Sequence, residues 1–131
     1  MRRNLTMNNY QQYAKSRGNT GESAVCDFLV RHGYRILRRN FTIRGGEIDI
    51  IAEKNGITAF VEVKTRKEGS LTTGEEAVTG SKKMHIVKTA QCYLNSLGKS
   101  VPCRFDVAVV TLEGERVTHL KYYVNAFDAS R

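Results

Sequence analysis

Two acidic residues and one lysine have the types and spacing to hold a metal ion beside a phosphate. Asp49, Glu62 and Lys64 flank the dipeptide Asn55-Gly56. Asn-Gly favours a two-residue hairpin turn because both positions tolerate positive φ. With that turn Asp49 lies directly opposite Glu62. Lys64 projects from the same face, about 7 Å further along its strand.

Carboxylates that face each other across a hairpin repel and destabilise it. The pattern therefore favours a cation between Asp49 and Glu62. Magnesium takes oxygen ligands and is commonly held by one or two carboxylates, with water and substrate phosphate completing the shell. The Val63 carbonyl is a further candidate ligand for Mg²⁺ or Mn²⁺. With Lys64 near the scissile phosphate, these parts are suited to phosphodiester hydrolysis.

A solvated sheet face is the alternative interpretation of this hairpin. Glu47 opposite Lys64 would then be an ordinary cross-strand ion pair, worth about 0.2–1 kcal/mol. Two apolar residues share the face, however, and a sheet in an α/β domain usually has both faces covered. Ion pairing also leaves Asp49 opposite Glu62 unexplained. The spacing alone keeps both interpretations open.

Glu22 is a further acidic candidate. Helical spacing aligns it with Cys26 and Leu29, at the margin of a packed helix face. From there it could reach toward Asp49 as a metal ligand or water anchor. The alternative is a capping box, with Asn19 at the N-cap and Glu22 at N3, and composition alone favours the cap.

The basic residues indicate a polyanionic partner. The net charge is +8, which points first to nucleic acid. Lys82 and Lys83 open the second expected helix, where the N-terminus attracts phosphate. The alternative for these two lysines is that they are simply solvated. A second, denser basic set could line a groove that follows a nucleic-acid backbone. This second set comprises Arg35, Arg38, Arg39, Arg44, Arg66 and Lys67.

The elements that must position these residues follow from periodicity. The 131 residues suit one domain, with a flexible basic arm at 1–18 and a single domain at 19–131. The expected order is helix, three strands, helix and two strands, at 19–33, 34–43, 47–54, 57–64, 81–97, 104–111 and 117–124. The connection at 65–80 is long enough to be functional or mobile. One long crossover helix predicts an α/β fold with a central mixed sheet flanked by helices.

Cysteine usage and hydropathy bear on the compartment. Cys26, Cys92 and Cys103 are widely spaced and form no CxxC pair, which argues against a disulfide framework or a zinc cluster. No apolar run approaches the ~20 residues of a membrane helix, and no signal peptide is apparent. We therefore expect a cytoplasmic protein that does not engage a membrane.

Motifs along almost the whole chain share one resemblance. They are Gly21-Glu22, Gly33-Tyr34-Arg35-Ile36-Leu37, Arg39-Asn40, Gly46-Glu47-Ile48-Asp49-Ile50-Ile51-Ala52, Phe60-Val61-Glu62-Val63-Lys64-Thr65-Arg66 and Arg104-Phe105-Asp106-Val107. Together they resemble the YraN-like family of small bacterial proteins, related to archaeal Holliday-junction resolvases and the PD-(D/E)xK nucleases. The resemblance implies a restriction-endonuclease-like fold. It also implies that Asp49, Glu62 and Lys64 are catalytic, that Glu22 assists from the first helix, and that Lys82 is the basic residue of the later helix.

The resulting expectation is a metal-dependent DNA endonuclease that acts on branched or structured DNA, as Holliday-junction resolvases do. Two alternatives use the same fold: a nucleic-acid-binding module that does not cut, and an interaction component of a DNA repair or uptake assembly. The intact Asp-Glu-Lys set argues against the binding module. A homodimer would let two strands be cut, but the sequence shows no self-complementary surface.

Overall fold

The structure is a computed structural model that describes residues 17–70 and 79–129. In this part of the chain the order is helix, three strands, helix and two strands, as the periodicity predicted. The elements are α2 (Arg17–Arg31), β1 (Arg35–Ile43), β2 (Gly46–Lys54), β3 (Ile57–Lys67), α3 (Gly80–Leu97), β4 (Cys103–Glu113) and β5 (Arg116–Phe127).

The five strands form one mixed sheet in the order β1-β2-β3-β4-β5. Neighbouring strands are antiparallel except β3 and β4, which are parallel and are joined through α3. A parallel pair needs a long crossover, and α3 supplies it. The predicted α/β class with a central mixed sheet is confirmed.

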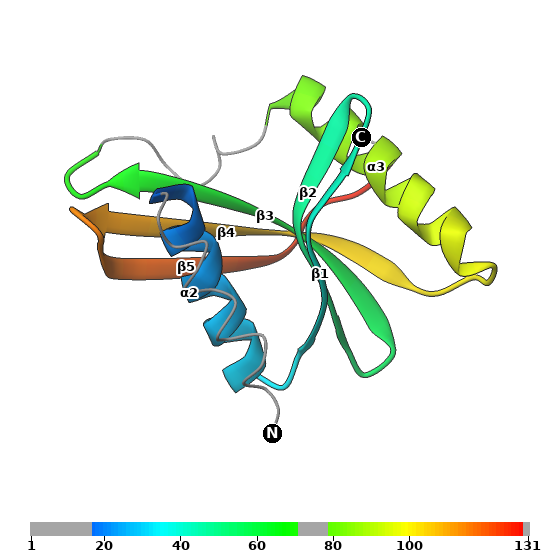
Figure 1. Cartoon of the computed structure of the whole chain (residues 1–131), viewed down its shortest axis with the longest axis horizontal. Helices are drawn as coiled ribbons and strands as arrows, with labels where there is room; N and C mark the ends of the chain where they lie inside the picture. Colours follow the sequence, from blue (N-terminus) through cyan, green and yellow to red (C-terminus); the bar gives the residue numbers. More distant parts are fainter. Residues whose placement is uncertain (1–16, 71–78, 130–131) are drawn as a thin grey trace.

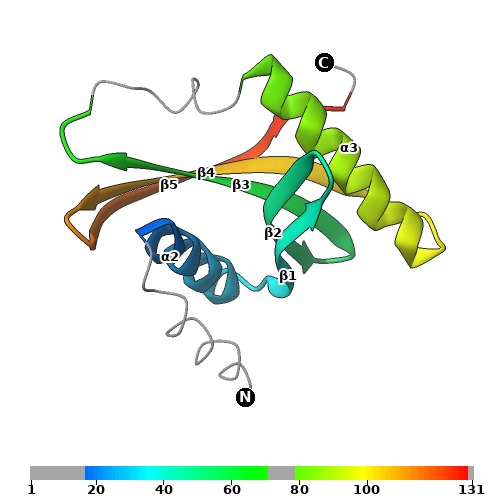
Figure 2. The ribbon, with the colours of Figure 1, turned by 45° about the horizontal axis from the view of Figure 1, so that its top comes forward.

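The two helices cover opposite faces of the sheet (Figure 2). Residues alternate along each strand, so Ile50 and Val61 pack with α2 while Ile51 and Phe60 pack with α3. All four of these side chains are buried. The interpretation of a solvated sheet face is therefore wrong, since helices cover both faces.

The hairpin between β2 and β3 forms as its turn residues predicted. Asn55 and Gly56 both have positive φ, at 54° and 80°. These angles match the turn type that continues the right-handed twist of the two strands. The pairs run from Lys54–Ile57 to Ile50–Val61, which is the expected register.

Beyond these pairs the two strands separate. β2 continues along β1, where Glu47 pairs with Thr42, and β3 continues along β4 as far as Lys67. Figure 1 shows the β1–β2 hairpin turning away from the far half of β3. The expected ion pair between Glu47 and Lys64 is absent among the described residues, because the strands no longer run together there.

Several element boundaries differ from the sequence prediction. α2 begins at Arg17, so residues 17 and 18 belong to the helix, and residues 1–16 of the predicted arm lie outside the described part. β3 extends to Lys67, which shortens the predicted 65–80 connection, and residues 71–78 of it also lie outside. Within the described ranges, no helix has the length and apolar character to cross a membrane.

Candidate active site

Asp49 and Glu62 lie at the fork where β2 and β3 separate. One carboxylate oxygen of Asp49 accepts a hydrogen bond from the Val63 N–H at 2.7 Å. The acidic side chain thus bonds across the fork to the strand that carries Glu62. The Glu62 side chain is only 7% exposed and lies on the α3 side of the sheet.

Burial and mutual repulsion dominate the electrostatics of the pair. Burial, followed by the charge of Glu62, raises the pKa of Asp49 to about 8, although the Val63 N–H acts in the opposite direction. Glu22 and Glu47 add smaller repulsion of the same sign. Both effects favour the protonated form of Asp49, and a divalent cation beside it would favour the charged form.

The chemistry of this donor set fits a hard divalent cation. Asp49 and Glu62 both offer carboxylate oxygen, and a positive charge between them would relieve the repulsion. Among the described residues, no three His, Cys, Asp or Glu side chains are grouped closely enough to hold one ion. The fork is thus a two-carboxylate site, in which water and substrate would have to complete the coordination.

Glu22 supports this site from α2. Its carboxylate accepts hydrogen bonds from Arg39 Nη2 at 3.3 Å and from Asn40 Nδ2 at 3.2 Å. Burial raises the pKa of Glu22, while the hydrogen bond and charge of Arg39 oppose that rise. The capping-box interpretation is wrong, because α2 begins at Arg17 and Asn19 lies inside the helix.

Asn40 connects Glu22 to the strand that carries Asp49. Asn40 lies on β1 between residues 39 and 41, whose partners on β2 are residues 50 and 48, so it stands across from Asp49. Its φ of 52° is unusual for a strand residue and marks a local bend in β1. The hydrogen bonds of Glu22 thus join α2 to β1 across from Asp49, and among the described residues Glu22 forms no metal-binding group with Asp49 and Glu62.

Two glycines let both helices approach the sheet beside the fork. A Cβ atom at Gly21 of α2 would stand 2.4 Å from Thr65 Cγ2 on β3. A Cβ atom at Gly46 of β2 would stand 2.1 Å from Thr89 Oγ1 on α3. Both distances are far below van der Waals contact, so a larger residue at either position would force the facing threonine to move.

The two candidate lysines of the site have different environments. Lys64 is exposed on β3, two residues beyond Glu62, and makes no ion pair among the described residues. Lys82, in the first turn of α3, places its Nζ 2.9 Å from Glu62 Oε2. The hydrogen bond to Glu62 raises the pKa of Lys82, against the opposing effect of burial. The sequence suggested a phosphate contact for Lys82 but not its contact with Glu62.

The arginines of β1 differ in exposure, since Arg35 and Arg38 are exposed while the Arg39 side chain is largely buried. Arg35 forms an ion pair with Glu53 at 2.5 Å, and the Arg38 guanidinium lies 5.0 Å from the Phe41 ring centroid. Arg39 binds the carboxylate of the first helix, as described above. Arg44 is exposed at the β1–β2 turn. Arg35, Arg38 and Arg44 therefore face solvent, and Arg39 does not.

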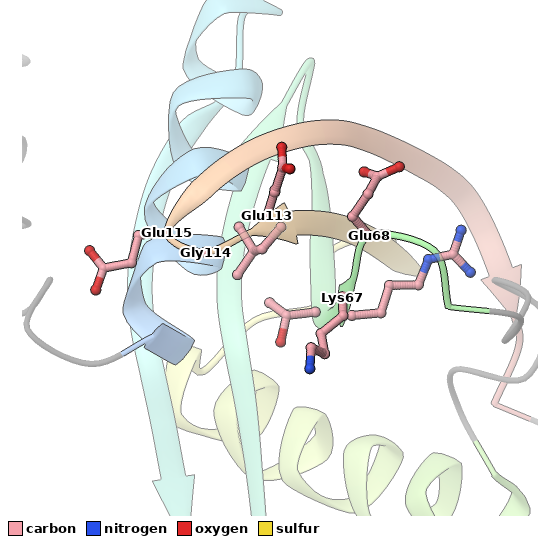
Figure 3. A pocket seen from close by; sticks show the side chains of 8 residues that line it. Lys67, Glu68, Glu113, Gly114 and Glu115 are labelled. Atoms are coloured by element: carbon pink, nitrogen blue, oxygen red, sulfur yellow. The ribbon is translucent and has the colours of Figure 1, made fainter.

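Arg66 and Lys67 lie apart from β1, at the end of β3. Arg66 donates to Thr111 Oγ1 at 3.4 Å, and Lys67 is exposed. Both residues line an open hollow between the ends of β3 and β4 (Figure 3). The other lining residues include Glu68, Glu113 and Glu115, so the hollow has mixed charge. The predicted basic set thus divides into a β1 group and a β3 group.

A buried polar network on β4 has no counterpart in the sequence prediction. Asp106 is fully buried and accepts hydrogen bonds from Arg104 Nε at 3.0 Å, Tyr122 OH at 2.6 Å and Asn125 N at 2.8 Å. Arg104 also donates to the Tyr34 hydroxyl. Burial, followed by Asp106, raises the pKa of Tyr122. An aspartate inside an apolar strand was the signal available in the sequence. The network joins β4 to β5 and plays a structural part.

The fold and the fork together define a mixed α/β protein with a carboxylate pair, one member buried and the other partly buried, beside basic residues. The sequence profile of the Uncharacterised protein family UPF0102 matches residues 21–110. The chain belongs to this family, which confirms the resemblance to YraN-like proteins.

Individual relatives match over most of their length. A UPF0102 protein of Symbiobacterium thermophilum is 43% identical over 113 residues, which cover 86% of this chain and 96% of the relative. One from Lachnoclostridium phytofermentans is 44% identical over 117 residues, covering 88% and 95%. One from Persephonella marina is 42% identical over 115 residues, covering 86% and 93%. The chain and these relatives therefore correspond along nearly their whole extent.

Proposed function

We propose that this protein is a metal-dependent DNA endonuclease of restriction-endonuclease-like type. The observation that carries the proposal is the carboxylate pair at the strand fork, in which Glu62 is buried and Asp49 is partly buried. Burial and the charge of Glu62 raise the pKa of Asp49, so the ionised form of Asp49 is costly unless a cation lies beside it. Side chains whose pKa values are strongly shifted by burial and by a charged neighbour are common at functional sites.

Each residue of the fork has a role in this proposal. Asp49 and Glu62 hold Mg²⁺ or Mn²⁺, and the Val63 carbonyl is an available third protein ligand. When bound, the ion neutralises charge on the phosphate and lowers the pKa of a water molecule. Lys64, exposed on the same strand, meets the scissile phosphate or the attacking water. Glu22 positions β1 through its bonds to Arg39 and Asn40.

The charge distribution supports a DNA substrate. The chain carries a net charge of +8. Lys82 and Lys83 lie in the first turn of α3, where the helix dipole also favours phosphate. The exposed Arg38, Arg44 and Lys67 add further backbone contacts. A branched or structured DNA is the substrate that the resemblance to junction resolvases suggests, and a cytoplasmic location follows from the same function.

A DNA-binding module that does not cut is the second candidate. The observation that favours it is the ion pair between Lys82 and Glu62, which neutralises one carboxylate without a metal. Such a module would bind DNA with a steep salt dependence and leave the strands intact.

Cleavage assays separate the two candidates. End-labelled junction, flap and duplex DNA are incubated with the full chain in Mg²⁺ or Mn²⁺. We expect metal-dependent products that disappear with Asp49→Ala and with Lys64→Ala. Glu113→Ala and Arg116→Ala, which each remove one exposed charge of the ion pair at the β4–β5 turn, are the matched controls and should retain activity. Intact DNA in every assay, or full activity of Asp49→Ala, would rule out the endonuclease.

A further inference from the structure

We propose that Lys82 is a built-in counter-ion of Glu62, and that a divalent cation must displace it in order to bind at the fork. This inference rests on the proposed function, because it requires that Asp49 and Glu62 bind such a cation. Beyond that function, the inference links cation binding at the fork to the position of the Lys82 side chain in the first turn of α3.

The contact between Lys82 and Glu62 uses the accessible side of the carboxylate. Lys82 Nζ is 2.9 Å from Glu62 Oε2, and the Glu62 side chain is 7% exposed while that of Lys82 is 52% exposed. The ammonium therefore comes from the solvent side onto a carboxylate that is otherwise covered. A divalent cation on the same carboxylate would be repelled by an ammonium at this distance.

A nearly buried carboxylate has more need of this partner than a surface carboxylate would. Glu62 is one of the few charged side chains that the described structure buries. An ionised carboxylate in that position requires a partner or a cation, because water reaches it poorly. Lys82 meets that requirement in the absence of metal, and the cation would meet it when bound.

The backbone of α3 allows Lys82 to leave without unfolding the helix. Thr79 caps the helix, with its Oγ1 accepting from the Lys82 N–H at 3.2 Å. Only the long, half-exposed side chain has to rotate into water. Once displaced, its ammonium stands at the helix N-terminus beside the fork, where it can contact a phosphate.

Lys83 provides an internal comparison. It carries the same charge in the same helical turn, but its Nζ lies 5.5 Å from the Phe127 ring centroid, and no ion pair joins it to Glu62 among the described residues. Removal of Lys83 lowers the local positive charge without vacating Glu62. An effect of general charge on cation affinity should therefore appear in both Lys82→Ala and Lys83→Ala, whereas loss of the competing ammonium should appear in Lys82→Ala alone.

Calorimetric titration of the full chain with Ca²⁺ tests the competition without relying on catalysis. We expect Lys82→Ala to bind Ca²⁺ about tenfold more tightly than the wild type, since a charge-assisted competitor is lost. Lys83→Ala should change the affinity by less than about threefold, as expected for a screened charge. Lys82→Arg restores a competing cation and should return the affinity close to that of the wild type.

Titration of Asp49→Asn with Ca²⁺ distinguishes a failure of the proposed metal site from a failure of the proposed competition by Lys82. If the wild type binds Ca²⁺ and Asp49→Asn does not, the metal site stands. In that case, equal affinities for Lys82→Ala and Lys83→Ala would overturn the competition alone. If no variant binds Ca²⁺, the metal site of the proposed function is overturned, and the displacement of Lys82 with it.

Discussion

Replacement of Asp49 by asparagine tests whether the fork holds two carboxylates under repulsion. Asparagine has nearly the same shape and keeps an oxygen that can accept the Val63 N–H bond. It has no titratable proton and no negative charge beside Glu62. We therefore expect Asp49→Asn to stabilise the metal-free protein, although it removes a proposed metal ligand.

The sign and size of this effect follow from the pKa of Asp49. Burial and Glu62 raise that pKa from 3.8 to about 8 in the folded protein. Between these values the folded state holds a proton that the unfolded chain has released, so stability falls as pH rises through this window. At about 1.4 kcal/mol per pH unit, the window sets an upper limit of about 6 kcal/mol. Because the side chain is partly exposed and water relaxes around it, we expect about 2 kcal/mol.

Urea unfolding at several pH values measures the difference directly. The free energy of unfolding of Asp49→Asn should exceed that of the wild type by about 2 kcal/mol at pH 8 and by almost nothing at pH 4. Near pH 8 this corresponds to a rise of about 4–8 °C in Tm for a chain of this size. Glu113→Gln, an exposed carboxylate, should change stability by less than about 0.5 kcal/mol at either pH.

A divalent cation should make the wild type more stable than Asp49→Asn, which is the reverse of their order without metal. With Ca²⁺ at 100 times its Kd, the wild type gains about 2.7 kcal/mol and Asp49→Asn gains nothing. The reasoning is refuted if the variant is less stable than the wild type at pH 8 without metal. It is also refuted if the difference between them does not grow with pH.

Two further predictions concern the packing that holds the fork in place. Asp106→Ala should lower the free energy of unfolding by about 3–5 kcal/mol, because Arg104, Tyr122 and Asn125 lose the fully buried acceptor that they share. A loss under about 1 kcal/mol in urea unfolding would contradict this. Gly46→Ala should cost about 1–3 kcal/mol through its clash with Thr89, whereas Gly80→Ala, with open space around it, should cost almost nothing. In a double-mutant cycle, Thr89→Ala should recover part of the Gly46→Ala loss, and strict additivity of the two changes would exclude the clash.

The local features of the fold could be predicted because nearby residues determine them. The Asn55-Gly56 turn depends on which residues tolerate positive φ, and the observed angles agree. That turn fixes the register as far as Ile50–Val61, and so predicts which carboxylates come together. The order of helices and strands likewise follows from periodicity over short windows.

The partners of the site residues could not be predicted in the same way. Glu47 was assigned to Lys64 by extending the register, but it pairs with Thr42 because β1 competes for that part of β2. Glu22 was weighed as a cap, yet it binds Arg39 and Asn40, more than fifteen residues away along the chain. Such contacts depend on how elements that are distant in the sequence pack together. The local pattern of residue types carries no information about that packing.

The sequence by itself determined that Asp49 and Glu62 meet, since a two-residue turn and strict alternation leave only one register. Only the tertiary structure decided that the strands part beside this pair, that Lys82 reaches it from α3, and that Glu22 joins α2 to β1. The physical reason is that beyond Ile50–Val61 the two strands follow different hydrogen-bonding partners, β1 for β2 and β4 for β3. The two helices cover opposite faces of the resulting sheet, and these contacts join segments that are far apart in the sequence.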